Sequence, residues 1–301
     1  MSTTYFAPAK LNLFLHVTGR RADGYHLLES VFQLIDFGDT LTIETRPDGV
    51  IRRVNEVAGV PPAHDLAVRA AQLLQHHSGT LQGADLTLEK RVPLGGGLGG
   101  GSSDAATVLL ALNRLWGLHH SRQQLMALAL ALGADVPFFV FGQNAFAQGI
   151  GERLEPVDLP PLWYVVVIPP VSAPTAAIFA APELTRNAKS VKIADFSAGG
   201  QIWFPEPLFR NDLQPVAETA YPEIGQLAAW LRAACVRIAA AGKTAAAISA
   251  RMTGSGACVF AGFGSKAAAQ AVLALRPAGV GGFVAQGLGH HPLHDFVSEK
   301  L

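Results

Sequence analysis

The sequence predicts a two-domain protein of mixed strands and helices. Its 301 residues exceed the usual length of one domain, and half of them are hydrophobic, so the chain can bury a sizeable core. Stretches with the two-residue period of strands alternate with stretches of helical spacing. Proline and glycine residues cluster at 151–163, where the composition changes. We therefore expect one domain at 1–158 and a second at 159–301, whose last strand and tail can pack back on the first.

The composition argues against several kinds of partner. Lys and Arg number 23, as do Asp and Glu, so the formal net charge is zero and no broad field attracts nucleic acid or an anionic membrane. The N-terminus lacks the pattern of a signal peptide, and the apolar runs are far shorter than the ~18 residues of a membrane span. Cys235 and Cys258 form no disulfide framework or zinc pair, so we expect both to be buried. The sequence thus predicts a cytoplasmic protein without an obligatory protein partner, as a monomer or weak dimer.

The first half begins with strands. Apolar residues at 11, 13, 15 and 17 alternate with Lys10, Asn12 and their neighbours, which predicts a strand with one apolar face and places Lys10 and Asn12 on the same side. A turn at 20–26 follows. The segment at 27–46 is typical of two strands interrupted at 36–39 by Asp-Phe-Gly-Asp.

The later elements follow from the same periodicities. Serines open two of the helices, where their hydroxyls can cap free backbone N–H groups. The elements are a helix at 64–77, a strand at 84–90, helices at 102–116 and 121–132, a strand at 163–170, helices at 221–241 and 265–275, and a strand at 282–286.

The most unusual segment is PLGGGLGGGSSDAA, residues 93–106, with six glycines at 95–101. Its place between a strand and a helix argues against a flexible linker and favours anion binding at a helix N-terminus, with a tight structural turn as the alternative. It matches GxGxxG at Gly95, Gly97 and Gly100, but no strand ending in an acid follows. It also matches the P-loop spacing, but Ser102 stands in the place of the lysine.

Three ordered segments resemble the small-molecule kinase superfamily of galactokinase, homoserine kinase and mevalonate kinase, the GHMP kinases. They are PAKLNLFL at 8–15, the glycine loop at 93–103 and TGSGACVF at 253–260. RADGYH at 21–26 and LGADVPFF at 132–139 are most similar to the branch that acts on a cytidine diphosphate derivative of methylerythritol. The similarity extends over essentially the whole chain.

The resemblance implies a two-domain α+β (α/β) fold of the GHMP-kinase type. A glycine-loop N-terminal domain and a smaller α+β sandwich C-terminal domain would flank the active site. The implied reaction is ATP-dependent phosphorylation of the substrate's 2-hydroxyl in the non-mevalonate isoprenoid pathway, with Mg2+ as second cofactor. The alternatives are a mevalonate- or homoserine-type kinase, whose substrates carry no base, and a ligand sensor without activity.

The resemblance assigns ATP to the glycine loop. Backbone N–H groups would hold the phosphates, and hydroxyls at the helix start could reach phosphate or Mg2+, with Ser103 the candidate metal contact. The alternative is that these serines only cap the helix. No cluster of side chains is expected to bind the metal directly. The ATP-binding residues are Pro93, Leu94, Gly95, Gly96, Gly97, Leu98, Gly99, Gly100, Gly101, Ser102 and Ser103.

The implied catalytic residues are Asp135 and Lys10. Asp135 would accept the proton of the substrate hydroxyl, and a nearby Lys10 would keep it ionised and stabilise developing charge. From spacing alone, Asp135 before Val-Pro is typical of an N-cap. Lys10 could instead be an edge-strand lysine that discourages aggregation.

The resemblance places the substrate against a second set of residues. Aromatic rings in RADGYH can hold a base, with Phe179 as cover, and the glycines of TGSG can bring N–H groups to substrate phosphates. Ordinary packing of Tyr25 and a tight turn at 254–256 are the alternatives. The substrate residues are Asn12, Tyr25, His26, Phe179, Gly254, Ser255 and Gly256.

Several positions depart from the pattern or lack an assigned role. Ala180 stands where relatives carry a lysine, and Asp65 where relatives carry asparagine. Asn211 and Asp212 resemble another family segment, for which we expect a structural role. The paired histidines beginning at 76, 119 and 290 are expected to be solvated, because adjacent side chains diverge and a pair does not chelate without a third ligand.

Overall fold

The computed structural model describes residues 2–198, 201–202, 204, 207–242 and 246–298. Its strands are β1 (Ser2–Arg20), β2 (His26–Arg46), β3 (Ile51–Arg53), β4 (Gly83–Glu89), β5 (Ala145–Gly149), β6 (Arg153–Pro156), β7 (Trp163–Ile168), β8 (Ser197–Ala198), β9 (Gln201–Ile202), β10 (Ala246–Met252), β11 (Val259–Phe263) and β12 (Gly281–Leu288). Its α-helices are α1 (Leu66–Ser78), α2 (Gly100–Leu115), α3 (Arg122–Leu130), α4 (Val136–Phe141), α5 (Thr175–Ala180), α6 (Ile193–Phe196), α7 (Gln214–Ala220), α8 (Pro222–Ala240) and α9 (Lys266–Ala274), with 3-10 turns η1 (Pro62–His64) and η2 (His294–Phe296).

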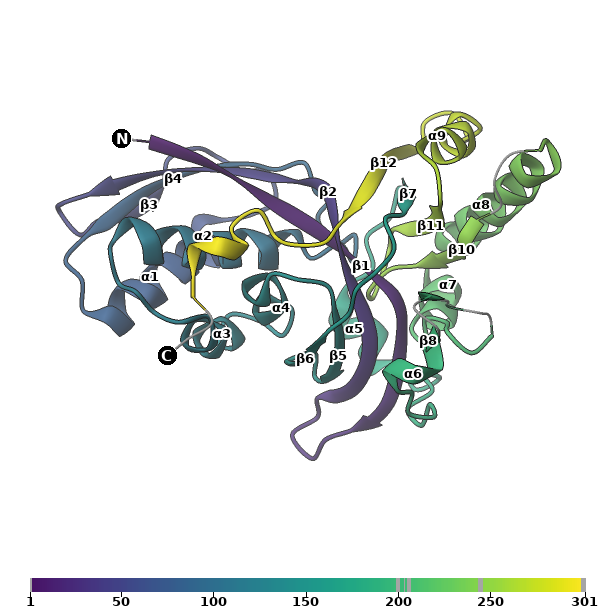
Figure 1. Ribbon diagram of the computed structural model, residues 1–301, viewed down its shortest axis with the longest axis horizontal. Helices are drawn as coiled ribbons and strands as arrows, with labels where there is room; N and C mark the ends of the chain where they lie inside the picture. Colours follow the sequence, from purple (N-terminus) through teal and green to yellow (C-terminus); the bar gives the residue numbers. More distant parts are fainter. Residues whose placement is uncertain (1, 199–200, 203, 205–206, 243–245, 299–301) are drawn as a thin grey trace.

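Ten of the described strands join in one mixed sheet. Its main path runs β10-β11-β7-β12-β2-β4-β3, while β1 pairs with β2, and β5 with both β2 and β6. The long strands β1 and β2 run across the molecule, with α1 to α4 beside one end and α8 and α9 beside the other (Figure 1). The predicted α+β class is confirmed.

Strand β12 connects the later strands to the first ones. It pairs with β7 over 281–286 and then with β2 at Gly287 and Leu288. The chain then returns past α2 (Figure 1), and Ser298, the last described residue, accepts from the N–H of Arg122 at the start of α3. Leu293 and Val297 of this tail are buried with the side chains of the first helices. The division into domains at 1–158 and 159–301 stays a prediction.

The predicted interruption at 36–39 is wrong, because β2 is one continuous strand. Its pairing partner changes there instead, from β5 and β12 to β4 at residue 40. Gly38 permits this, since a Cβ at that position would lie 2.1 Å from the carbonyl oxygen of Ala7. The register with β1 shifts between Pro8 and Lys10, opposite the same place. The turn-forming residues thus produce a β-bulge inside the sheet.

Strand β1 is buried on both faces over residues 7–17, whereas the sequence predicts one apolar face. Lys10, Asn12 and His16 occupy the second face and are each 3% exposed. Buried polar groups are retained only when they find partners. This second face of β1 therefore needs partners from other elements, which the site described below supplies.

The first three helices start and end within two residues of their predicted bounds, but only one of the two predicted serine caps is present. Helix α3 has the predicted serine cap, because Ser121 accepts from the N–H of Gln124 and forms a capping box. Helix α2 begins at Gly100, inside the glycine run, after Gly99 as N-cap without any side-chain cap. The predicted cap of this helix by a serine is therefore wrong.

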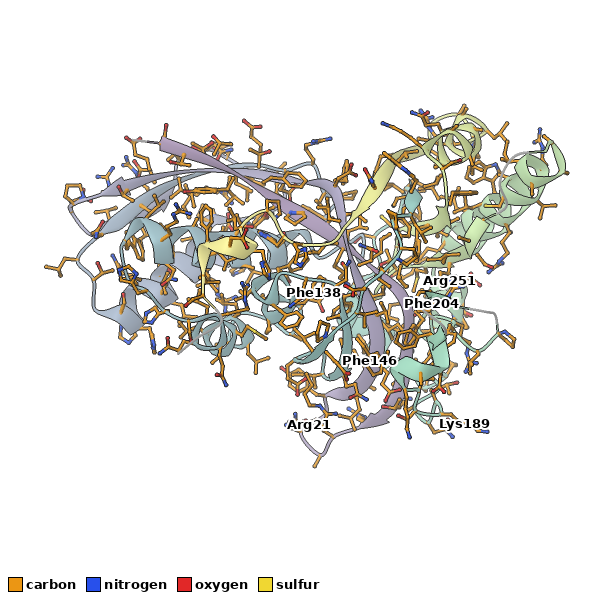
Figure 2. The ribbon with its side chains drawn as sticks, viewed as in Figure 1. Arg21, Phe138, Phe146, Lys189, Phe204 and Arg251 are labelled. Atoms are coloured by element: carbon orange, nitrogen blue, oxygen red, sulfur yellow. The ribbon has the colours of Figure 1, made fainter. Side chains whose placement is uncertain are left out.

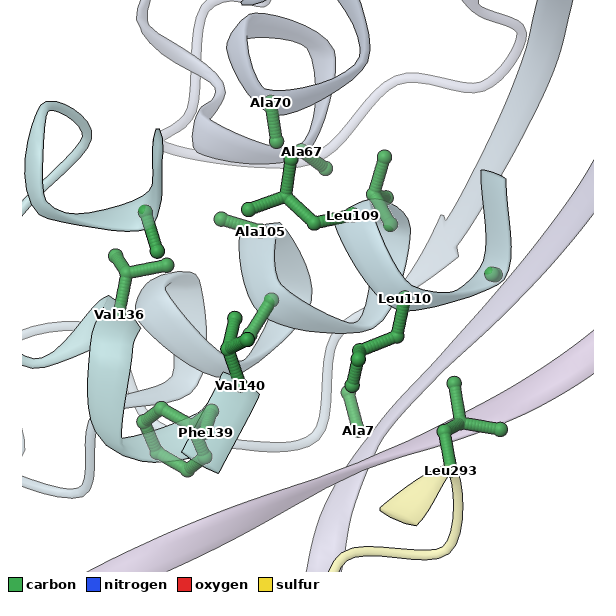
Figure 3. Close-up of a cluster of buried hydrophobic side chains, with 14 of the residues drawn as sticks. Ala7, Ala67, Ala70, Ala105, Leu109, Leu110, Val136, Phe139, Val140 and Leu293 are labelled. Carbon is green, nitrogen blue, oxygen red and sulfur yellow. The ribbon is translucent and has the colours of Figure 1, made fainter. Parts of the chain in front are cut away.

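A core cluster of small and branched side chains fills the space between the first helices and the sheet. Figure 3 shows alanines of α1 and α2 facing each other, with leucines of α2 and side chains of α4 beside them. Alanine at these positions lets the two helices approach closely. The labelled residues are Ala7, Ala67, Ala70, Ala105, Leu109, Leu110, Val136, Phe139, Val140 and Leu293.

A second cluster lies among α8, α9 and the strands β7, β10 and β11, and a third joins β1 to the later strands. The third contains stacked and tilted rings of Phe14, Phe196, Phe204 and Phe209. Arg251 lies near Phe204 (Figure 2) and donates from Nη1 to the carbonyl of Leu13 at 3.0 Å.

Both cysteines are buried, as predicted. Burial raises the pKa of the Cys235 thiol to about 11 and that of Cys258 to about 12. None of the helices in the described part of the chain combines the length and the apolar character that a membrane span needs.

Truncation of Leu110 tests the packing of the first core cluster. Leu110 is fully buried, so Leu110→Ala leaves a cavity and should lower the free energy of unfolding by about 2–5 kcal/mol. Urea denaturation measures this loss. Leu81→Ala, at a side chain that is 84% exposed, is the matched control and should change the free energy by less than about 0.5 kcal/mol. An equal loss in both variants would contradict the packing described here.

Candidate active site

A cleft of about 790 Å³ lies where the glycine loop, β1, the turn after β1 and the start of α4 meet α5 and the segment 254–256. Of the predicted site residues, all but one line this cleft. The exception is Ser103. The predicted residues that line it are Lys10, Asn12, Tyr25, His26, residues 93–102, Asp135, Phe179, Gly254, Ser255 and Gly256.

The glycine loop has a backbone shape that other residues rarely adopt. Gly95, Gly97 and Gly99 have φ of +66°, +73° and +72°. At Gly97 a Cβ would also lie 2.2 Å from the carbonyl oxygen of Thr253. The alternation of left-handed residues requires glycine, and the close approach at Gly97 explains why even a small side chain has no room there.

Backbone from both ends of the sequence holds the loop. The N–H of Lys10 donates to the carbonyl of Leu98 at 2.9 Å. From the other side, the N–H groups of Ala257 and Cys258 donate to the carbonyls of Gly95 and Gly96 at 3.1 and 3.2 Å. The segment TGSGA thus contacts the glycine loop directly, which sequence reasoning did not predict.

The start of α2 presents free donors to the cleft. The N–H groups of Gly100, Gly101 and Ser102 donate no hydrogen bond to any of the described residues. These groups open a sixteen-residue helix, whose positive dipole end faces the same place. This is the arrangement that binds phosphate at helix N-termini.

The two serines of this helix have different surroundings. Ser102 lines the cleft. Ser103 is fully buried, and its hydroxyl donates to the carbonyl of Pro8 at 2.7 Å. The structure therefore contradicts the prediction that Ser103 contacts Mg2+, because the hydroxyl faces β1 rather than the cleft. Ser102 is the hydroxyl available at this position.

Lys10 and Asp135 meet at the centre of the cleft. Lys10 Nζ lies 3.3 Å from Asp135 Oδ2, although 125 positions separate the two residues in sequence. Asp135 is the N-cap residue of α4, as its sequence alone predicts, but its carboxylate makes no capping bond and is paired with Lys10 instead. Lys10 is 3% exposed, which excludes the role of a solvent-facing edge lysine. The side chain of Asp135 is 35% exposed and faces the cleft.

Asn12 holds the lysine in place. Lys10 Nζ donates to Asn12 Oδ1 at 2.5 Å, and Asn12 Nδ2 donates to Ser30 Oγ at 2.8 Å. Ser30 in turn donates to the carbonyl of Phe14. This chain of bonds satisfies the buried face of β1 and fixes the Lys10 ammonium beside Asp135. The structure thus places Asn12 against Lys10, whereas the resemblance implies a contact of Asn12 with the substrate.

The aromatic pair at the other end of the cleft differs from the predicted one. The ring of His26 lies against that of Phe179, with centroids 5.0 Å apart and planes at 32°. Tyr25 is 59% exposed at the rim and makes no ring contact within the described residues. Burial lowers the pKa of His26, and the charges of Arg186 and Arg20 lower it further. His26 is therefore neutral near pH 7.

The sequence analysis did not identify two groups of residues at the site. Arg186 contacts His26 and Phe179 and is described below. Lys90 lines the cleft at the start of the glycine loop and binds the carboxylates of Asp39 and, at 2.8 Å, Asp104. The only sequence signal for the second group is the position of Lys90 and Asp104 on either side of the loop.

The carboxylates of this buried cluster share one lysine. Asp39 also accepts from the N–H groups of Arg91 and Val92, at 2.6 and 2.8 Å. Asp104 Oδ1 has no partner among the described residues. Burial raises the pKa of Asp104 to about 7, with the nearby Asp39 adding to the effect against the opposing charge of Lys90. Burial alone would lower the pKa of Lys90, but Asp104 and Asp39 raise it.

Asn211, Asp212 and Asp65 have structural roles, as expected for the first two. Asn211 Nδ2 donates to the carbonyls of Met252 and Gly254, and Asp212 accepts from the N–H of Val17. They join the TGSG segment to β1. Asp65 caps α1 and forms a buried ion pair with Arg53 at 2.7 Å.

The paired histidines form no metal site in the part of the chain that the structure describes, where no three His, Cys, Asp or Glu side chains gather suitably. The prediction that all are solvated is wrong for His291, which is 2% exposed. Burial, with the charges of Arg122 and His294, lowers the pKa of His291 to about 3. Its Nδ1 accepts from the N–H of Leu293, so it helps to fix the tail.

Comparisons with known proteins agree with this geometry. The family described as GHMP kinases N terminal domain matches residues 65–143, and GHMP kinases C terminal matches residues 193–278. The 4-diphosphocytidyl-2-C-methyl-D-erythritol kinase of Thiobacillus denitrificans is 58% identical over 299 residues, covering 99% of this chain and 100% of the relative. The kinase of the same name from Nitrosospira multiformis is 55% identical, covering 97% and 94%.

Solved structures are similar over the same length. A crystal structure of 4-(cytidine 5'-diphospho)-2C-methyl-D-erythritol kinase has a TM-score of 0.72 and 36% identity, covering 95% of this chain and 100% of that one. Homoserine kinase from Cytophaga hutchinsonii has a TM-score of 0.67 at 18% identity, covering 96% and 95%. The second likeness shows the shared fold alone.

Replacement of Asp104 tests its unusual protonation. The pKa of Asp104 is about 7 in the folded protein, whereas that of an aspartate in the unfolded chain is about 4. The folded state therefore holds the proton more tightly, and this contribution to the free energy of unfolding is fully present below pH 4. It is lost as the pH rises to 7. The stability of the wild type relative to Asp104→Asn should therefore fall between pH 4 and 7. Urea denaturation at several pH values measures the difference. Asp158→Asn, at an exposed carboxylate, is the control, and a wild-type advantage that grows with pH would contradict the assignment.

Proposed function

The chain belongs to the 4-diphosphocytidyl-2-C-methyl-D-erythritol kinase family of GHMP kinases, and from this premise we propose its reaction. It transfers the γ-phosphoryl group of ATP to the 2-hydroxyl of 4-diphosphocytidyl-2-C-methyl-D-erythritol, in the non-mevalonate isoprenoid pathway. The observation that carries the proposal is the pairing of Lys10 with Asp135 beside a glycine loop that presents free N–H groups.

The phosphates of ATP bind to backbone donors. The N–H groups of Gly100, Gly101 and Ser102 and the dipole of α2 face the cleft, so they can balance negative charge without a lysine in the loop. Because these donors are fixed before the ligand arrives, little reorganisation accompanies charge transfer. The loop thereby positions the γ-phosphoryl group for in-line attack.

Asp135 acts as general base and Lys10 as its electrostatic partner. The side chain of Asp135 is 35% exposed and faces the cleft, so its carboxylate can accept the proton of the substrate hydroxyl. The Lys10 ammonium, held by Asn12, favours the ionised carboxylate and stabilises charge that develops on the attacking oxygen. No covalent enzyme intermediate is required.

Mg2+ fits this site as an ion that enters with ATP. Mg2+ is usually bound by one or two carboxylates together with substrate phosphates and water, rather than by a cage of side chains. The cleft offers the Asp135 carboxylate and the Ser102 hydroxyl for this purpose. When bound, the ion neutralises charge on the transferring phosphoryl group.

The base of the substrate binds at the far end of the cleft. His26 and Phe179 form an apolar ring surface there, with Tyr25 at the rim. A flat base can stack on such a surface. Mevalonate- or homoserine-type substrates carry no base and would leave this surface without a contact, which favours the cytidine substrate over them.

A coupled assay of ADP release tests the reaction. The wild type should release ADP with 4-diphosphocytidyl-2-C-methyl-D-erythritol and ATP, and far more slowly with mevalonate or homoserine. Faster turnover of either competitor would refute the substrate assignment. Absence of turnover with all three, while ATP still binds, would favour a ligand sensor.

Asp135→Asn tests the general base. Asparagine keeps the size of the side chain but cannot accept the proton, so kcat should fall by about 10²–10⁴-fold. The KM for ATP should change less than kcat, because the loop donors that hold the phosphates are intact and only one group offered to Mg2+ changes from carboxylate to amide. ADP release at saturating substrate measures this loss, with Asp158→Asn as the charge-matched control. Retention of the wild-type kcat would exclude Asp135 as base.

Lys10→Met tests the electrostatic partner. Methionine keeps the buried stem and removes the ammonium beside Asp135, so kcat should fall by about 10²–10³-fold. Single-turnover kinetics with ATP in excess separate this loss from product release. The control is Lys192→Met at an exposed lysine, which should retain wild-type turnover. Equal kcat values for both variants would restrict Lys10 to a structural role.

A further inference from the structure

Arg186 links the two rings at the base end of the cleft. Its Nε donates to His26 Nε2 at 3.0 Å. Its Nη2 donates to the carbonyls of Phe179 and Ala181, at 3.2 and 2.7 Å, and its Nη1 to that of Leu184 at 2.9 Å. One guanidinium group thus joins the start of β2 to the end of α5, which carry the two rings.

The contact with Arg186 fixes the protonation of His26. A guanidinium group has donors only, so Nε2 of His26 must be the acceptor. In a neutral imidazole one nitrogen accepts while the other carries the proton. The proton of His26 therefore lies on Nδ1, and Nδ1–H is the only remaining polar group of the ring.

The charged groups around His26 keep the ring neutral. Burial is the largest cause of its lowered pKa, followed by the charges of Arg186 and Arg20. Arg20 belongs to β1, while Asp23 and Tyr25 belong to the turn that leads to His26, and all three line the cleft. The direct bond to Arg186 distinguishes this residue from the others.

We propose that Arg186 is a positioning residue of the substrate-base subsite, which makes His26 a hydrogen-bond donor and holds Phe179 against it. The inference rests on the proposed function, because it concerns recognition of the base. Cytosine presents acceptors at O2 and N3, and a ring that donates from Nδ1 matches either of them. A His26 ring with the proton on Nε2 would present an acceptor at Nδ1, which matches the N4 amino group of cytosine but neither O2 nor N3.

Nitrogen-15 NMR of the histidines tests the first part without any substrate. In the full-length wild type at pH 7.5, His26 should be the Nδ1–H tautomer, with a pKa below the ordinary value of histidine; His26→Gln identifies its signals. In Arg186→Met nothing fixes the proton on Nδ1, so the tautomers should exchange and the pKa of His26 should rise. An unchanged tautomer and pKa in this variant would overturn the proposal.

Steady-state kinetics test the second part. Arg186→Met should raise the KM for the cytidine substrate by about fivefold, with kcat and the KM for ATP nearly unchanged. The defect should shrink as the pH falls from 7.5 to 6, because protonated His26 again donates from Nδ1. A merely structural role would instead lower kcat, change both KM values and show no recovery at low pH. Arg276→Met, at an exposed arginine outside the cleft, is the matched control.

Arg186→Lys is the replacement test if Arg186→Met does not fold. Lysine keeps the charge and one donor to His26 but cannot bind all three carbonyl groups, so it should keep the Nδ1–H tautomer and show a smaller rise in KM. Loss of the tautomer with an unchanged KM would contradict the proposal. If the wild type shows no turnover of the cytidine substrate, the proposed function fails, while the NMR result still decides the role of Arg186 at His26.

Discussion

The site depends on one constraint: a loop made of glycine must keep a single shape. Glycine loses more conformational freedom on folding than any other residue, so six glycines in seven positions need external support. The bonds from Lys10 to Leu98, from Ala257 to Gly95 and from Cys258 to Gly96 supply it. They come from the beginning and the end of the sequence, so the phosphate-binding loop has its shape only when the whole chain is folded.

The same strand that supports the loop also carries the chemistry. The backbone N–H of Lys10 binds the loop while its side chain extends to Asp135, so the loop and the pair of Lys10 and Asp135 have a fixed spacing. Burying an ammonium group is costly unless it is paired and hydrogen-bonded. Asn12 and Ser30 complete those bonds, so the burial of Lys10 and Asn12 on this face of β1 is explained by the site.

Sequence reasoning predicts the fold class, the approximate bounds of the longer helices and many of the cleft-lining residues, because periodicity and short motifs are local. It fails where a contact between distant segments decides the outcome. Ser103 has the sequence of a capping or metal-binding serine but faces Pro8, and Asp135 has the sequence of an N-cap but pairs with Lys10. Arg186 has no local signal at all, since its importance arises from its bond to a residue 160 positions away.

The two ends of the cleft use different kinds of donor, with different consequences for specificity. At the phosphate end the donors are backbone N–H groups, which every residue has and which do not titrate, so binding there depends on loop shape alone. At the other end we propose a histidine as the donor to the base, and whether its free nitrogen donates or accepts depends on the hydrogen bond made by its other nitrogen. Recognition of the base therefore needs a group that binds the other nitrogen of the ring and so determines whether the free nitrogen donates or accepts. Arg186 occupies that position, and it also fixes the partner ring through the carbonyl of Phe179.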